Sequence, residues 1–130
     1  MTEQLITSLK KPGRYAYEGL DCVIHEKARL SIVASLAGHA TGLLFGELKE
    51  VCSLTDGNLS RHLTILQEAG LIEVWKRWRN NRSLTLVRMT PEGRKRFLEY
   101  LEQLERVIED AEKTAPANPP VATSGTQLAV

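Results

Sequence analysis

The fold is decided by residues 54–70, which read LTDGNLSRHLTILQEAG. Thr55 is suited to cap a helix, and Asp56 places a carboxylate at the positive end of the helix dipole. The apolar residues recur at i, i+4 and i+7 and are Leu59, Leu63 and Leu66. This spacing predicts one apolar stripe on a helix over residues 55–69, and Gly70 ends it.

The opposite face of this helix is polar and carries Asn58, Ser60, Arg61, Thr64 and Gln67. In the major groove of duplex DNA, an arginine can donate two parallel hydrogen bonds to guanine, and an asparagine can pair in the same way with adenine. Thr55, Ser60 and Thr64 are short donors suited to phosphates or base edges. The alternative is that these are ordinary solvated helix positions. His62 lies between Arg61 and Leu63 and is suited either to DNA or to packing.

Residues upstream predict the partners of this helix. Apolar residues from Leu20 to Leu36 fall at three- and four-residue steps, which predicts one helix or a broken pair. Gly38 stands where a left-handed C-terminal cap is often found. Residues 43–45 form a short apolar run that could pair as a minimal strand, and residues 46–52 predict a helix of about two turns.

Downstream of Gly70 the pattern changes to that of strands. Residues 71–78 and 83–89 are rich in Ile, Val, Leu, Thr and Trp, and Asn80-Asn81 between them suits a tight hairpin because Asn tolerates positive φ. The hairpin carries a basic cluster consisting of Lys76, Arg77, Arg79 and Arg82. We expect these side chains to reach a flanking phosphate strand or the minor groove.

A long helix follows from Thr90-Pro91-Glu92, where Thr caps and Pro occupies the first helical position. Its apolar residues are spaced 4, 3, 4 and 3 and are Phe97, Leu101, Leu104, Ile108 and Ala111. This is the spacing of a coiled-coil seam, although it covers only about two heptads. The seam predicts a homodimer interface, and the alternative is that it packs within its own domain.

Charge is concentrated in one block of the chain. The whole chain has a net charge of +1, but residues 61–96 carry nine Lys or Arg against three Asp or Glu. Such a block is typical of a local footprint for a polyanion, or of a solvated face. Within it, Arg94, Lys95 and Arg96 stand near a helix N-terminus, where cations are unfavourable unless a polyanion offsets them.

Composition excludes several classes of protein. The 130 residues are 42% hydrophobic and 25% charged, which suits one domain, and no run is apolar enough to span a membrane. Neither a secretory signal nor a disulfide framework is visible, so a cytoplasmic location is expected. The histidines His25, His39 and His62 are far apart, and no phosphate loop or paired-carboxylate motif indicates an enzyme. We expect no cofactor and no metal.

Taken in order, these elements resemble a known family. The motifs are Val23-Ile24-His25-Glu26-x-x-Arg29-Leu30, Leu54-Thr55-Asp56-Gly57-Asn58-Leu59-Ser60-x-His62-Leu63, Leu66-x-Glu68-Ala69-Gly70-Leu71-Ile72 and Met89-Thr90-Pro91-Glu92-Gly93-Arg94. Together they are similar to the small single-domain winged helix-turn-helix transcriptional regulators of the MarR/ArsR-like superfamily, over residues 20–105. The wing departs from the family pattern at Asn80 and Ser83, where Gly and Pro are usual, and Trp78 and Arg79 make it more basic and aromatic.

The resemblance implies a mainly α (α+β) winged helix-turn-helix fold with a two- to three-stranded wing and a long C-terminal dimerisation helix. It implies a homodimer that binds double-stranded DNA at a palindromic operator and regulates transcription. The expected organisation is an N-terminal segment over 1–19 that could contribute to the dimer interface, a DNA-binding domain over 20–96, a dimerisation helix over 97–113 and a disordered tail over 114–130.

Two other functions remain open from the sequence. ArsR relatives sense metals through cysteine pairs, but Cys22 and Cys52 are far apart, and Cys52 lies at an apolar helix position that suits the core. A thiol- or metal-responsive regulator therefore has little support. The fold could also serve as a protein-interaction module that does not bind DNA, against which the basic wing argues. No effector can be named.

Overall fold

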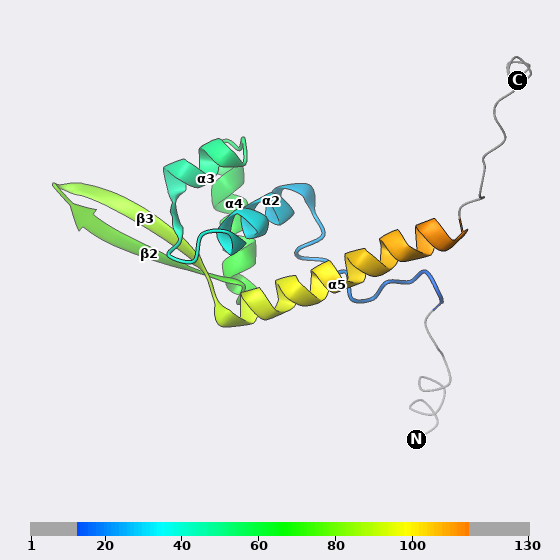
Figure 1. Cartoon of the computed structure of the whole chain (residues 1–130). Helices are drawn as coiled ribbons and strands as arrows, with labels where there is room; N and C mark the ends of the chain where they lie inside the picture. The colour runs from blue at the N-terminus through cyan, green and yellow to red at the C-terminus, as the bar shows by residue number, and fades with distance from the viewer. Residues whose placement is uncertain (1–12, 115–130) are drawn as a thin grey trace, which may run out of the picture.

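A computed structural model describes residues 13–114. The elements in chain order are α2 (Lys27–Ala37), β1 (Leu43–Leu44), α3 (Phe45–Val51), α4 (Asp56–Glu68), β2 (Ile72–Arg79), β3 (Arg82–Met89) and α5 (Pro91–Thr114) (Figure 1). This is the α+β winged helix-turn-helix predicted from the sequence. Of the predicted tail over 114–130, Thr114 is the last residue of α5, and the rest lies outside the described residues, as does most of the predicted N-terminal segment.

One apolar core joins α2, α3, α4 and the base of the sheet. Its residues with essentially no exposed surface include Ile24, Ile32, Leu36, Leu48, Leu59, Leu66 and Val87. The predicted stripe of α4 is confirmed, because Leu59, Leu63 and Leu66 all face this core. Burial of this stripe fixes which face of α4 is left for solvent.

The sheet has the order β1-β3-β2 and is antiparallel throughout. The two-residue strand β1 pairs only with Leu86 and Val87 of β3, so β2 and β3 continue outward from there as a two-stranded ribbon (Figure 1). We call residues 72–89 the wing. The predicted hairpin is confirmed, since Asn80 and Asn81 have φ values of 51° and 60°.

The first helix differs from the prediction. Helix α2 begins at Lys27, and residues 20–26 form turns instead of a helix that starts at Leu20. The carboxylate of Glu26 accepts a hydrogen bond from the Arg29 backbone N–H at 2.8 Å and caps the helix there. The prediction of a left-handed cap at Gly38 is wrong, because its φ is −85°. In the loop after α2, the glycine with positive φ is Gly42, at +96°, where an added Cβ would collide with the Val87 carbonyl.

A hydrogen-bonded junction connects the end of α4 to the start of α5. Thr90 caps α5 by accepting from Gly93 N at 2.9 Å, as predicted. The Thr90 hydroxyl also donates to the Gly70 carbonyl at 2.7 Å, and the Thr90 N–H donates to the Leu71 carbonyl at 3.0 Å. The Arg96 guanidinium donates to the Ala69 carbonyl at 2.9 Å. The carbonyls of three consecutive residues after α4 are therefore bound by Thr90, the cap of α5, and by Arg96 in its second turn.

The predicted seam on α5 is divided between the core and the surface. Phe97 is 8% exposed and Leu104 packs against the core, in agreement with the alternative that the seam packs within its own domain. Leu101 and Ile108 are 37% and 58% exposed. Of the four predicted dimerisation residues, only these two are exposed, since Phe97 is buried and Leu104 is half-buried.

Within residues 13–114, no helix has the length and apolar character needed to cross a bilayer.

Candidate nucleic-acid interface

Helices α3 and α4 form the helix-turn-helix. The Thr55 hydroxyl accepts a hydrogen bond from the Asn58 backbone N–H at 3.2 Å and so caps α4 as predicted. Across the turn, Lys49 of α3 lies 2.9 Å from the carboxylate of Asp56. Both side chains are largely in solvent, so this ion pair adds little to stability. The orientation of α4 is set mainly by its buried leucines.

The outer face of α4 and its cap carry the five side chains of this segment that the sequence assigned to DNA contact. Thr55, Asn58, Ser60, Arg61 and Thr64 are all exposed. The Arg61 guanidinium lies 3.4 Å from Asn58 Oδ1, which places the two potential base-reading groups next to each other. The Thr64 hydroxyl donates to the Ser60 carbonyl one turn earlier at 3.0 Å. This face has the size, polarity and donor content that a major groove accepts.

His62 faces the opposite way and packs inside the molecule. Its side chain is buried, and Nδ1 lies 3.3 Å from the Arg29 guanidinium and 3.9 Å from the Glu26 carboxylate. The Arg29 Nε also donates to the Val23 carbonyl at 2.6 Å. Of the two roles open for His62, the structure supports packing. The backbone N–H of Arg29 lowers the pKa of Glu26, against the effect of partial burial.

A groove of about 320 Å³ lies between the outer face of α4 and the inner face of the wing. The α4 side chains that line it include Ser60, Thr64 and Gln67, and the wing contributes Lys76 and Thr85. Lys76 and Thr85 are cross-strand partners and so share one face of the ribbon. The recognition face of α4 and one wing cation therefore open onto the same concave surface. Sequence reasoning did not assign Thr85, which the pairing register alone could have placed beside Lys76.

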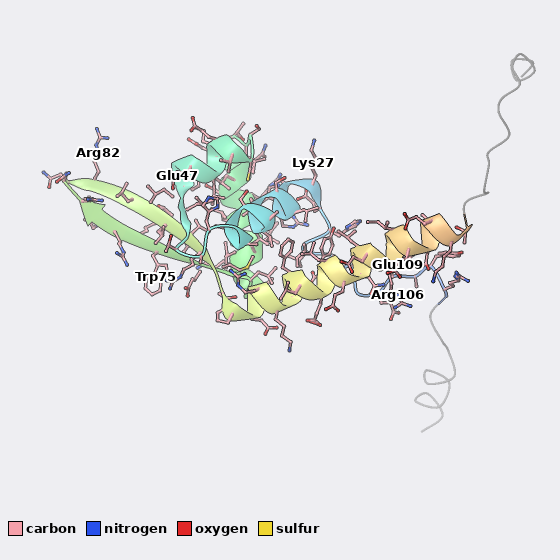
Figure 2. All side chains as sticks on the ribbon, in the orientation of Figure 1. Lys27, Glu47, Trp75, Arg82, Arg106 and Glu109 are labelled. Carbon is pink, nitrogen blue, oxygen red and sulfur yellow. The ribbon has the colours of Figure 1, made fainter. Side chains whose placement is uncertain are left out.

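The remaining wing cations lie on other parts of the ribbon. Lys76, Arg77, Arg79 and Arg82 are all exposed. The register puts Arg77, Arg79 and Arg82 on the face opposite Lys76, but a two-stranded ribbon twists strongly along its length. Figure 2 shows Arg82 at the tip and Trp75 nearer the base pointing to opposite sides of the wing. The four cations therefore surround the ribbon instead of forming one flat patch.

Two basic residues of the 61–96 block form ion pairs with carboxylates of the same chain. Arg88 pairs with Glu73 of the neighbouring strand, with Nη2 2.6 Å from the carboxylate. Arg96 pairs with Asp21 and is partly buried, so it cannot serve as a DNA contact in the way the trio with Arg94 and Lys95 suggested. Arg94 and Lys95 are exposed at the start of α5. The cations that face solvent are thus concentrated on α4, the wing and the first turn of α5.

The two cysteines lie apart in the structure. Cys22 is exposed, and the Cys52 sulfur packs against the core 3.6 Å from the Ser35 hydroxyl. Among residues 13–114, no group of three or more His, Cys, Asp or Glu side chains is placed to hold a metal ion.

The sequence of the chain is similar to a known family and to a known protein. The winged helix DNA-binding domain family matches residues 28–108. The chain belongs to this family. An uncharacterized protein from Methanocaldococcus jannaschii is 33% identical to this winged-helix chain over 90 residues, which cover 69% of the chain and 97% of that protein.

Solved structures of transcriptional regulators have the same fold. A transcriptional regulator homologue from Pyrococcus horikoshii matches with a TM-score of 0.66 and 25% identity, over 85% of this chain and 98% of that one. MepR of Staphylococcus aureus, solved as a DNA complex, matches with a TM-score of 0.61 and 15% identity, over 86% and 88% of the two chains. The resemblance to MarR-like winged-helix regulators is confirmed, and this winged-helix chain is a DNA-binding transcriptional regulator.

Proposed function

We propose that the chain acts as a homodimer that binds a palindromic site in double-stranded DNA and thereby regulates transcription. Helix α4 lies in the major groove, where Arg61 and Asn58 read base edges and Thr55, Ser60 and Thr64 bind phosphates or bases. Lys76, Arg77, Arg79 and Arg82 of the wing bind the flanking backbone or minor groove. Sequence specificity comes from α4, because contacts with phosphates carry little sequence information.

The observation that carries this proposal is the groove shared by α4 and the wing. Ser60 and Thr64 line it from the helix, and Lys76 lines it from the strand. A polyanion seated against α4 would therefore meet a cation of the wing without any rearrangement of the chain. MepR and a Mycobacterium tuberculosis regulator, MOSR, have the same fold in complexes with DNA, with TM-scores of 0.61 and 0.58.

The homodimer is proposed from α5 and from the small size of one recognition helix. A single α4 reads too few bases for useful specificity, whereas a two-fold dimer reads two half-sites about 34–36 Å apart. Leu98, Leu101 and Ile108 expose 54%, 37% and 58% of their surfaces along α5. Three exposed apolar residues on one helix give a second copy a surface to cover.

The test is selection of bound duplexes from a random pool, followed by affinity measurements on the selected site. Arg61→Ala should weaken binding by about 1–3 kcal/mol and relax the preference at one position in each half-site. Lys27→Ala is the matched control, because Lys27 is an exposed cation that projects from the start of α2, on the far side of α3 and α4 from the wing (Figure 2). It should leave both affinity and preference unchanged.

Salt dependence tests the phosphate footprint separately. A dimer with about 6–10 phosphate contacts should lose roughly 10³–10⁵ in affinity between 50 and 200 mM salt. Removal of a wing cation, as in Arg79→Ala, should weaken all sequences alike and flatten the salt slope by about one for each protomer, or about two for the dimer. No enrichment of any duplex at low salt would refute the proposal and favour a protein-interaction module instead.

A further inference from the structure

The wing carries a large apolar side chain that its own fold does not cover. Trp78 is 77% exposed, more than any other large hydrophobic residue in the described part of the chain. It lies on β2 directly between Arg77 and Arg79 and one pair from the end of the ribbon, opposite Ser83. An indole of this exposure contributes little to folding, so its place on the wing calls for a partner outside the protomer.

We propose that Trp78 packs into the minor groove of the DNA that flanks each half-site, with its ring against the deoxyribose walls. This inference rests on the proposed function. The charges of the wing near Trp78 define the partner. Lys76 shares its face of the ribbon, whereas Arg77, Arg79 and the cross-strand partner Arg82 project from the opposite face. An apolar ring on a ribbon that carries cations on both faces fits a ligand that presents both anionic and carbon-rich surface. The walls of a minor groove, sugars edged by phosphates, are such a ligand.

The reach of the wing agrees with this placement. Trp78 is six residues beyond Ile72, where β2 leaves the core. Six extended residues span roughly 20 Å. With α4 in the major groove, the adjacent minor groove lies half a helical turn away, or about 17 Å along the duplex. The indole ring of Trp78 is therefore far enough from the core to reach the adjacent minor groove, whereas the first residues of β2 lie beside α4.

The indole also predicts which flanking bases are preferred. The Trp Nε1–H group is a donor only, and the minor groove of an A·T pair offers only acceptors. A G·C pair adds the guanine N2 amino group, which occupies space at the groove floor. This group is itself a hydrogen-bond donor, so it cannot accept a hydrogen bond from the indole. Flanks of A·T pairs should bind better than flanks of G·C pairs for this reason.

The two tryptophans of the chain, Trp75 and Trp78, make a matched fluorescence experiment possible. Trp75 is 46% exposed and lies three positions before Trp78 on β2, on the opposite face of the ribbon, so it serves as the control. In the full-length Trp75→Phe variant, the emission of Trp78 should change on addition of the selected duplex. In the Trp78→Phe variant, the emission of Trp75 should stay unchanged.

Affinity measurements complete the test. Trp78→Ala should weaken binding to the selected duplex roughly ten-fold, the loss expected when one buried indole is removed from an interface. Trp78→Phe should recover part of the loss, and Trp75→Ala should have little effect. In flanking G·C pairs, replacement of guanine by inosine removes the amino group and should raise affinity toward that of A·T flanks.

Two failures can be told apart. If the wild-type protein enriches no duplex, the proposed function fails. If the wild type binds its duplex but Trp78→Ala binds equally well, or inosine has no effect, the assignment of Trp78 to the minor groove is refuted while DNA binding stands. Circular dichroism of Trp78→Ala confirms that any loss is not caused by unfolding.

Discussion

Arg96 binds Asp21 through two hydrogen bonds to one carboxylate oxygen, from Nε at 2.9 Å and from Nη2 at 2.6 Å. The two residues are 75 positions apart and join the turn before α2 to the first turns of α5. The same guanidinium donates to the Ala69 carbonyl at the end of α4. One side chain thus connects three segments that are distant in sequence.

The first prediction concerns the loss of this connection. Arg96→Met should lower the free energy of unfolding by about 1–3 kcal/mol, because it leaves a partly buried carboxylate and a backbone carbonyl without their donor. Arg94→Met is the control, since Arg94 is an exposed cation two residues away. Urea denaturation of both variants measures the difference. Equal stability of the two variants would show that the Asp21 pair contributes nothing.

The second prediction concerns pH. Burial disfavours the charged form of Asp21, but the hydrogen bond from Arg96, the Val23 and Ile24 backbone N–H groups and the Arg96 charge outweigh it and lower its pKa. A carboxyl whose pKa is lower in the folded state adds stability at pH values above its unfolded pKa of about 3.9, and this stability is lost as pH falls through the folded pKa.

Stability of the wild type should therefore fall as pH decreases from about 5 to 3. Asp21→Asn should be less stable at neutral pH and should show a shallower fall over the same range. Denaturation curves at a series of pH values provide the measurement. A variant with the wild-type slope would exclude Asp21 as a source of the acid sensitivity.

The third prediction concerns Gly93 in the first turn of α5. A Cβ atom at this position would collide with the backbone carbonyl of Leu71, which cannot move aside because it accepts the Thr90 N–H. Gly93→Ala should cost about 1–3 kcal/mol of stability. Gly46→Ala in α3 is the control, because no atom lies within 4 Å of its added Cβ. It should be neutral or stabilising by up to about 1 kcal/mol. Thermal unfolding compares the two, and equal Tm values would contradict the collision.

The fourth prediction concerns the oligomeric state. A Leu101→Glu/Ile108→Glu double variant should sediment as a monomer if α5 forms the dimer interface, because four charges would face one another across the two-fold axis. Val51→Glu is the control, since Val51 is 63% exposed on α3 and far from this surface in sequence and fold. It should remain dimeric. Unchanged sedimentation of the double variant would exclude this part of α5 as the interface.

The elements governed by local rules were predictable from the sequence. The cap at Thr55, the stripe of α4 and the Asn80-Asn81 turn each depend on residues close together in the chain, and the structure has all three. The start of α2 was not predictable from periodicity, because the Glu26 side chain caps the helix at a point where the apolar spacing continues unbroken.

The features that were missed depend on contacts distant in sequence. In the sequence, Arg96 is one of three neighbouring cations that would be predicted to be exposed. Its contact with Asp21 forms only in the folded chain. The division of α5 into a buried and an exposed part follows from the packing of Phe97 against Tyr100 and the core, which spacing alone does not distinguish from a seam between two chains.

The junction between α4 and α5 bears on how far apart two half-sites can be. Because Thr90 and Arg96 bind the carbonyls of Ala69, Gly70 and Leu71, the end of α4, which we propose reads DNA, is held directly against the start of α5, which we propose forms the dimer. Insertion of a single base pair at the centre of an operator turns one half-site by about 34° relative to the other. Because the junction between α4 and α5 cannot absorb this rotation, we expect the protein to bind the original operator but not the one with the insertion.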